Sequence, residues 1–160
     1  MNIDWDALVK TYDVRGLVGT ALTTEIVTAL AAGFVDELGA AGQDVVVGHD
    51  MRDSSPEFAD AFAIGAQARG ANVVSIGLCS TDESYFASGI FNAPAAMFTA
   101  SHNPAAYNGI KLSRAGARGI SLDTGLALET KANQLLFSSQ DQKEGMAAFI
   151  EKRKARFTGR

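Results

Sequence analysis

Short apolar runs alternate with longer segments of helical periodicity through the first 120 residues, and this alternation limits the folds open to the chain. The run Asp44 to Gly48 (DVVVG) lacks polar alternation, which is typical of a strand covered on both faces. Ile26, Leu30, Phe34 and Leu38 recur every four residues and predict a helix with one buried face. The same criteria predict further strands at 11–19, 72–77, 95–99 and 108–112, and further helices at 55–70 and 82–89. This order predicts an α/β domain with a largely parallel sheet.

Capping residues mark the ends of the predicted helices. Thr23 or Thr24 is expected to cap a helix that runs to about residue 39. Ser55 is expected to be the N-cap of the next helix, because Pro56 suits the first helical position. Gly70 is well placed to end that helix.

The character of the sequence changes after Gly119. From residue 123 onward the pattern is wholly helical, with helices predicted at 126–136 and 140–156. Ser139 and Gln142 have the spacing of a capping box for the second of them. We therefore expect one α/β domain over residues 1–122, followed by a helical tail over residues 123–160.

Size and charge exclude several classes of protein. A chain of 160 residues fits one ordinary domain and buries a core without disulfides, and its single cysteine, Cys79, excludes an internal disulfide. The net charge of −4 argues against a nucleic-acid or anionic-membrane surface. We find no secretory signal, and no apolar run reaches the roughly 20 residues that span a bilayer. We expect a cytoplasmic protein without nucleic-acid or membrane partners.

One loop carries reactive side chains. Ser101 and His102 follow the predicted strand at 95–99, and the loop that they begin continues through Asn103 and Pro104. The carboxyl edge of an open α/β sheet is where such folds bind ligands, and a loop hydroxyl beside an imidazole suits proton or phosphate chemistry. The alternative is a simple turn, since Ser, Asn and Pro are common turn residues.

Three motifs, in order, resemble the α-D-phosphohexomutases, in the phosphomannomutase/phosphoglucomutase branch. The segment Ala100 to Pro104 (ASHNP), followed by Tyr107 to Lys111 (YNGIK), is similar to the family's serine-loop signature. Tyr12 to Gly16 (YDVRG) resembles its N-terminal motif, and Gly48 to Ser55 (GHDMRDSS) its Gly-x-Asp-x-Arg-x-Ser segment. The resemblance covers roughly residues 8–125. It implies the family's first domain, a three-layer α/β/α unit with a mixed, mostly parallel sheet.

The resemblance also implies catalytic roles. Ser101 would carry a phosphoryl group that passes to a hexose monophosphate, so that a bisphosphate intermediate interconverts sugar 1-phosphates and 6-phosphates. Lys111 would stabilise the transferring phosphoryl group, Arg15 would hold phosphate oxygens or orient Lys111, and His102 would act on the substrate hydroxyl. The alternatives are that Lys111 is a solvated residue at a strand end, and that Arg15 pairs with a nearby aspartate, residue 13 or 50.

Other positions have binding or structural roles in this scheme. Tyr12, Asn103 and Asn108 are expected to bind the substrate. Asp50, Arg52 and Ser54 are assigned mainly to structure: the Asp50 and Ser54 side chains bond their own backbone, and Arg52 ties that loop down. His49 is expected to be a surface or hydrogen-bonded histidine, and Cys79 a small buried apolar residue.

The family uses Mg²⁺, which the phosphate on Ser101 would share with three aspartates of an Asp-Gly-Asp-x-Asp-Arg loop in a second domain. We find no such loop in the sequence. A hard cation takes about six oxygen ligands, so one serine phosphate does not hold it well. The resemblance implies glucose 1,6-bisphosphate as activator and hexose phosphates as partners, and it predicts that the chain does not turn over alone.

The tail resembles a different family. Residues 126–129 and 138–160 are similar to the C-terminal end of enoyl-CoA hydratases, the crotonase family. The chain thus resembles a splice of two families near residues 121–128, of natural, artefactual or engineered origin. The alternative is a generic amphipathic helix. The tail is a candidate surface for helix-mediated self-association.

The sequence is compatible with three functions. The first is a phosphoserine-bearing domain of a phosphomannomutase/phosphoglucomutase, with the choice between mannose and glucose undecided. The second is a non-catalytic fragment that binds sugar phosphates or assembles with other chains. The third is a CoA-ester binder or hydratase, which the absence of crotonase catalytic residues disfavours. Phosphoglucosamine mutase is a rival within the first family.

Overall fold

The computed structural model describes residue 8, residues 13–120 and residue 156. The described part holds the helices α2 (Thr24–Leu38), α3 (Ser55–Ala68) and α4 (Thr81–Phe91). Its strands are β1 (Asp13–Leu17), β2 (Asp44–His49), β3 (Asn72–Leu78), β4 (Ala95–Phe98), β5 (Tyr107–Arg114) and β6 (Arg118–Gly119). The expected helices at 126–136 and 140–156, with the capping box of Ser139 and Gln142, lie outside the described residues.

The strands form one mixed sheet in the order β1-β5-β4-β2-β3, with β6 paired to β5. The parallel pairs are confined to β3-β2-β4, whereas β5 runs antiparallel to β4, β1 and β6. The antiparallel part is larger than the sequence pattern indicates. The connection from β4 to β5 spans only residues 99–106, and a parallel crossover needs a dozen or more residues.

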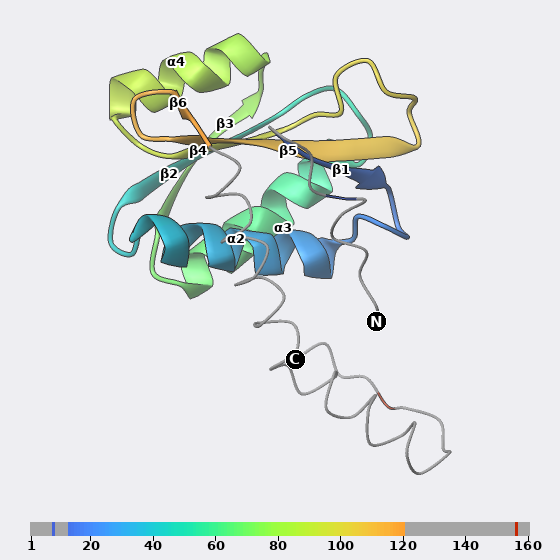
Figure 1. Cartoon of the computed structure of the whole chain (residues 1–160), viewed down its shortest axis with the longest axis horizontal. Coiled ribbons are helices and arrows are strands. Elements are labelled where there is room, and N and C mark those ends of the chain that lie inside the picture. The colour runs from blue at the N-terminus through green and yellow to red at the C-terminus, as the bar shows by residue number, and fades with distance from the viewer. Residues whose placement is uncertain (1–7, 9–12, 121–155, 157–160) are drawn as a thin grey trace.

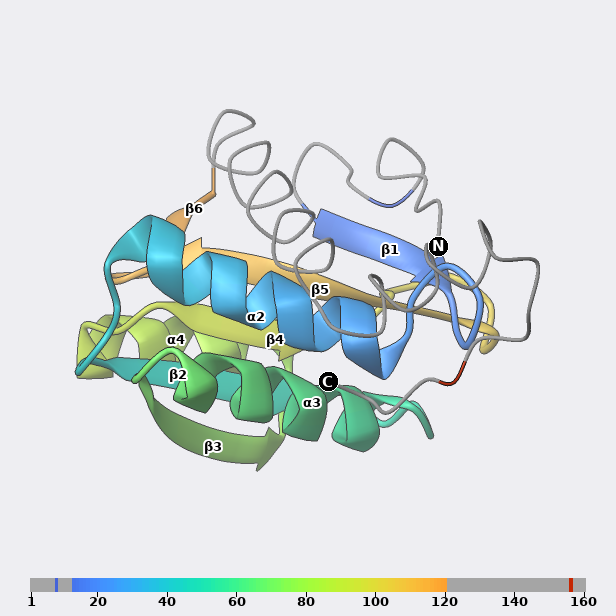
Figure 2. The same ribbon diagram turned by 90° about the horizontal axis from the view of Figure 1, so that it is seen from below.

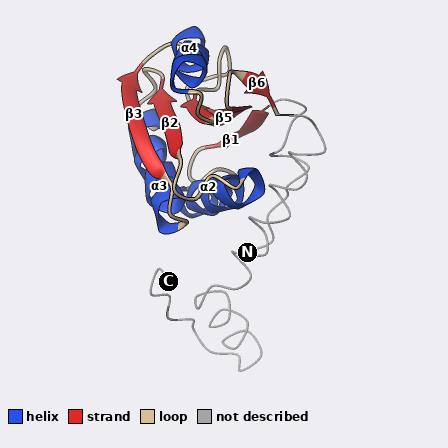
Figure 3. Cartoon of the chain, turned by 90° about the vertical axis from the view of Figure 1, so that its left-hand side faces the viewer, coloured by secondary structure: helices blue, strands red, loops and turns tan. Residues whose placement is uncertain are grey.

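Helices cover the sheet on both faces, which confirms the predicted α/β/α architecture. Figure 1 shows α4 on one face and α2 with α3 on the other, and Figure 3 shows the same layers from the side. Figure 2 shows α2 and α3 lying side by side across the sheet. A Cβ at Gly65 of α3 would collide with the Thr28 carbonyl of α2, so this glycine permits the close approach of the two helices.

The larger core lies between the sheet and the α2–α3 layer. Phe34 and Phe98 each contact Phe62 edge-to-face, with ring centroids 5.7 Å apart in both pairs. Such pairs add about 1 kcal/mol each to the free energy of burial. Under α4 the core is built from smaller side chains, among them Ala87 and Ala95.

The helix ends correct one prediction and extend another. Thr23 caps α2 as expected, because its hydroxyl accepts the Ile26 N–H. Ser55 is not an N-cap: it is the first residue of α3, and its hydroxyl donates to the Asp50 carboxylate instead. Ser80 caps α4 in a capping box that the sequence analysis did not identify.

The ends of the strands also differ from the prediction. β5 continues to Arg114, two residues beyond the expected end at 112, and then pairs with the unpredicted strand β6.

None of the described helices combines the length and apolar character needed to cross a membrane.

Candidate functional site

The serine loop, residues 99–106, leaves the carboxyl end of β4 and returns as β5. Within it, Ser101 has a φ of 55°, in the left-handed region that costs an L-residue about 1 to 2 kcal/mol. The Ser101 N–H donates to the Thr99 hydroxyl at 3.0 Å, and the Asn103 N–H donates to the Ala100 carbonyl at 3.0 Å. The Ser101 side chain is exposed, so a strained backbone presents an accessible hydroxyl.

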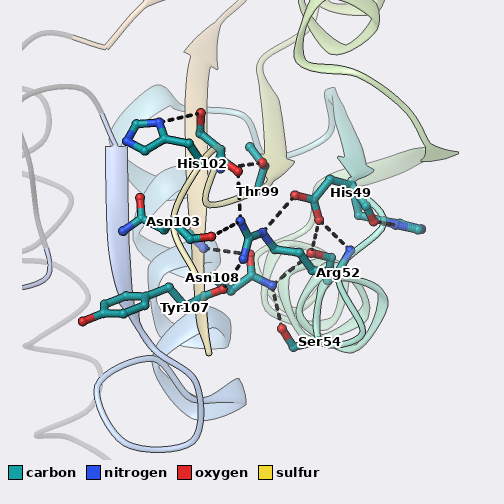
Figure 4. A network of polar contacts seen from close by, with 12 residues as sticks. His49, Arg52, Ser54, Thr99, His102, Asn103, Tyr107 and Asn108 are labelled. Atoms are coloured by element: carbon teal, nitrogen blue, oxygen red, sulfur yellow. Dashed lines mark hydrogen bonds and ion pairs between the residues drawn. The ribbon is translucent and has the colours of Figure 1, made fainter. Parts of the chain in front are cut away.

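Arg52 holds this loop through three of its backbone carbonyls and through that of Tyr107, the first residue of β5. Its Nη1 donates to the carbonyls of Pro104 and Tyr107, each at 3.0 Å. Its Nη2 donates to the carbonyls of Ser101 and Asn103, at 2.9 and 2.7 Å. Figure 4 shows the guanidinium inside the curve of the loop. One planar cation thus fixes the loop before and after its turn, a geometry suited to arginine and not to lysine.

Asp50 supports the clamp from behind. Its carboxylate lies 3.3 Å from Arg52 Nε as an ion pair, and it accepts hydrogen bonds from the Arg52 N–H at 3.0 Å and from the Ser55 hydroxyl at 2.6 Å. Burial opposes the charge, but the bonds from Ser55, the Arg52 N–H and Thr99, together with the charge of Arg52, lower the pKa of Asp50. The ionised carboxylate is therefore part of the folded loop.

Asn108 anchors the far end of the loop from inside the protein. It is fully buried, and its amide donates to the hydroxyls of Ser54 and Ser55 at 2.8 and 3.0 Å. Its side-chain oxygen accepts the Gly109 N–H at 2.8 Å. These contacts replace the expected role in substrate binding, because the amide faces α3 and not solvent. Asn108 lies two residues before the core residue Ile110 in β5, so both side chains are on the same face of the sheet. This spacing is the sequence signal that indicates the orientation.

Two cationic side chains, Arg15 and Lys111, come from the neighbouring strands β1 and β5. The register pairs Asp13 of β1 with Lys111 of β5, which places their side chains on one face. Arg15 contacts the Asp13 carboxylate through Nη2 at 2.6 Å, and Lys111 Nζ lies 3.4 Å from the same oxygen. Arg15 thus pairs with Asp13, one of the two aspartates considered. Its Nη1 also donates to the Asn103 side chain at 2.8 Å, which joins β1 to the serine loop.

His102 lies beside Ser101, with its Nδ1 at 3.5 Å from Ser101 Oγ, the outer limit of a hydrogen bond. The structure therefore gathers Ser101, His102, Asn103 and Arg15 on or against one loop, and Lys111 joins them through Asp13. Tyr12 lies outside the described residues.

The surroundings of His49 and Cys79 are close to those that the sequence predicts. The ring of His49 donates from Nδ1 to the Asp50 carbonyl at 2.9 Å, as expected of a hydrogen-bonded histidine. Cys79 is half-buried, with its Sγ 3.6 Å from the Met97 sulfur, and burial raises the pKa of its thiol. The role of Arg52 across the serine loop was missed, because its contacts lie 49 to 55 residues away in the sequence.

The family profile of the phosphoglucomutase/phosphomannomutase alpha/beta/alpha domain I matches residues 6–138. The chain belongs to this family. The match runs past residue 125, where the mutase resemblance was expected to end, and the likeness of the tail to enoyl-CoA hydratase stays a prediction.

Individual mutases agree with the family assignment. The chain is 43% identical over 118 residues to a phosphohexose mutase of Xanthomonas campestris pv. campestris, which covers 73% of this chain and 26% of that protein. It is 41% identical over 121 residues to a phosphomannomutase of Vibrio cholerae, which covers 73% of this chain and 26% of that protein. The chain thus spans about a quarter of the length of these relatives.

A solved mutase structure has the same fold. A phosphoglucomutase/phosphomannomutase family protein from Burkholderia thailandensis superposes with a TM-score of 0.75 and 32% sequence identity. The superposition covers 86% of this chain and 32% of that one.

We predict that Arg52→Lys loosens the serine loop of this mutase domain, because one ammonium group does not reach four carbonyls. Hydrogen exchange measured by NMR should accelerate at the Asn103 and Tyr107 amides by at least about tenfold, which corresponds to ~1.4 kcal/mol of local stability. The matched control is Arg69→Lys, at an exposed arginine that pairs with Asp36. Equal exchange in both variants would show that Arg52 does not hold the loop.

We predict that Asp50→Asn removes stability that depends on pH. Because the pKa of Asp50 is lowered on folding, the carboxylate stabilises the fold above its unfolded value of 3.8, and this contribution fades as the pH falls through the folded value. Urea unfolding at pH 7 should show a loss of about 2 kcal/mol in the variant. The difference in free energy of unfolding between wild type and variant should shrink below pH 3.8. A difference that stays constant with pH would contradict the assignment.

Proposed function

We propose that Ser101 is the phosphoryl acceptor and donor of a phosphohexomutase that interconverts hexose 1-phosphates and 6-phosphates. The observation that carries the proposal is an exposed serine hydroxyl in a backbone held on both sides by Arg52. The relatives named above as phosphomannomutase and phosphohexose mutase support the choice of reaction class. The preference for mannose or glucose is left open by this proposal.

In the first step Ser101 Oγ attacks a phosphorus atom of a hexose bisphosphate. The Oγ–P bond forms as the bond from phosphorus to the sugar oxygen breaks, and that oxygen leaves with the electron pair. His102 Nδ1, which lies 3.5 Å from Ser101 Oγ, takes the serine proton and gives it to the departing sugar oxygen. In the reverse direction the phosphoserine transfers its phosphoryl group to a sugar hydroxyl, so the net reaction moves phosphate between two positions of the hexose.

Cations nearby suit the charge that this transfer involves. A phosphoserine carries up to two negative charges, and Arg15 and Lys111 are two positive groups on the same face of the sheet. Asp13 lies between them and keeps both side chains in place. We assign the guanidinium of Arg15 to the phosphate oxygens and the ammonium of Lys111 to the transferring group. Tyr12 and Asn103 are assigned to the sugar.

The loop geometry lowers the barrier by positioning the nucleophile in advance. Arg52, Asp50 and Thr99 fix the backbone on both sides of the hydroxyl, so little ordering remains to be done when substrate binds. None of these three groups needs to contact the substrate. They act as positioning residues for Ser101.

The family's Mg²⁺ does not fit the described residues taken alone. Among residues 13–120 no group of three or more His, Cys, Asp and Glu side chains could hold a metal ion. Asp13 and Asp50 are engaged by Arg15 and Arg52, the two arginines that contact the loop. We therefore derive no step through the metal. A full turnover would need metal ligands beyond the described residues. We propose that the described residues accept phosphate on Ser101 but do not isomerise hexose phosphates by themselves.

We predict that the chain gains the mass of one phosphoryl group when it is incubated with glucose 1,6-bisphosphate, as measured by intact-protein mass spectrometry. Fragmentation should place the group on Ser101. Ser101→Ala should gain none, and His102→Ala should gain it at least about tenfold more slowly, the usual loss for a missing general base.

Two controls complete the experiment. Ser80→Ala removes another exposed serine hydroxyl, at the cap of α4, and should be phosphorylated like the wild type. An unmodified wild-type chain, or a phosphoryl group on any residue other than Ser101, would overturn the proposal.

A further inference from the structure

Asn103 lies two residues after Ser101 and is held through its backbone and through its side chain. Its N–H donates to the Ala100 carbonyl at 3.0 Å, and its carbonyl accepts from Arg52 Nη2 at 2.7 Å. Its side-chain oxygen accepts from Arg15 Nη1 at 2.8 Å. Among residues 13–120, the side-chain N–H2 group of Asn103 is left without an acceptor. This group is therefore the part of Asn103 that is available to a ligand.

The Arg15 guanidinium reaches Asn103 in a fixed orientation. Its Nε and Nη2 both contact Oδ2 of Asp13, at 2.8 and 2.6 Å. The Asp13 side chain is only 8% exposed, and the pairing of β1 with β5 holds its backbone. Because a guanidinium is planar and rigid, these two contacts direct Nη1 toward the serine loop. Asp13 and Arg15 thus form a rigid connection from β1 to Asn103.

This connection decides which end of the Asn103 amide faces outward. An arginine side chain has five N–H donors and no acceptor. A reversed amide would place two N–H groups against each other, so the amide oxygen faces Arg15 and the amide nitrogen faces away from it. In Figure 4 the Asn103 side chain points away from the Arg52 guanidinium. Asn103 therefore presents a donor, and not an acceptor, beside the serine loop.

A donor in a fixed orientation recognises an acceptor oxygen. The oxygens of a phosphoryl group are strong acceptors, and the oxygens of a sugar accept as well. A group that is already oriented loses little freedom when the substrate binds. We propose, resting on the phosphoryl transfer proposed above, that Arg15 is a positioning residue for Asn103. In this arrangement Asn103 Nδ2 donates to an oxygen of the transferring phosphoryl group or of the sugar phosphate.

A purely structural role of Asn103 has a different consequence. If Asn103 only tied the serine loop to β1, an aspartate would serve equally well, because its carboxylate accepts the same bond from Arg15 and adds an ion pair. The variant Asn103→Asp thus keeps the contact with Arg15 and removes the outward donor.

The first experiment measures how fast the full chain takes a phosphoryl group from glucose 1,6-bisphosphate, by intact-protein mass spectrometry. Asn103→Asp should be slower than wild type by at least about tenfold, which corresponds to ~1.4 kcal/mol in the transition state. The matched control is Asn72→Asp, at an exposed asparagine that begins β3, and it should keep the wild-type rate. A wild-type rate in Asn103→Asp would show that Asn103 is only a structural tie.

A double-mutant cycle tests the positioning role of Arg15. Arg15→Met removes the direct contact of Arg15 with phosphate and also releases the amide of Asn103. In Asn103→Ala that amide is already absent, so Arg15→Met should slow transfer at least about threefold less than in wild type, a coupling of ~0.65 kcal/mol. Effects that simply multiply would contradict the positioning role. Arg69→Met, at an exposed arginine of the α3 C-cap, should leave the rate unchanged in both backgrounds.

NMR of the Asn103 side-chain amide distinguishes the two sources of the oxygen. Its Nδ2 protons should move downfield in the chain phosphorylated on Ser101 if the oxygen belongs to the phosphoryl group. They should move in the unmodified chain with glucose 1-phosphate if the oxygen belongs to the sugar phosphate. The side-chain amide of Asn72 should keep its position in both samples. Asn103 signals that move in neither sample would overturn the proposal.

The outcomes separate this inference from the proposed function. A wild-type chain that takes up no phosphoryl group on Ser101 would overturn the proposed function, and this inference with it. Normal phosphorylation of Ser101, with the same rate in Asn103→Asp, would overturn this inference alone.

Discussion

The guanidinium of Arg52 is the contact on which the site depends. The chain reverses direction between β4 and β5 within residues 99–106, and three carbonyls of this reversal point toward Arg52. Arg52 satisfies four carbonyls at once, and Asp50 balances its charge. The bonds to the Tyr107 and Asn103 carbonyls are part-buried, and a buried carbonyl without a partner costs about 1 to 3 kcal/mol, so the loop and the arginine form one structural unit. The left-handed backbone of Ser101 is held inside that unit.

The arrangement of the sheet then decides what surrounds the hydroxyl. Because β5 runs antiparallel to both β4 and β1, the strand that leaves the serine loop lies beside β1, the strand that carries Arg15. Register places Lys111 opposite Asp13, and Arg15 reaches back to Asn103. Arg15 of β1 thereby contacts the serine loop, and Lys111 of β5 shares the carboxylate of Asp13 with it. The mixed sheet thus positions the side chains of the proposed site.

Local features of the sequence were predictable, and long-range pairings were not. The helices and the strands β2 and β3 follow from apolar runs and caps, which act within a few residues. The antiparallel half of the sheet and β6 depend on pairings between distant segments. Ser55 is a residue type typical of N-caps, but its hydroxyl donates to the Asp50 carboxylate instead. The motif resemblance indicated Ser101, His102, Arg15 and Lys111, whereas Arg52 has no local pattern that reveals its partners about 50 residues away.

We propose that Ser101, His102, Arg15 and Lys111 form a site for a phosphoryl group on Ser101. The most direct measurement is a ³¹P NMR titration of the phosphorylated chain. An isolated phosphoserine has a second pKa of about 6, and nearby cations favour the dianion. We predict that the phosphate on Ser101 titrates with a midpoint below about pH 6, and that the midpoint rises toward about pH 6 in Lys111→Met. A midpoint at or above about 6 that Lys111→Met leaves unchanged would contradict it, because the phosphate would then lie outside the field of Arg15 and Lys111.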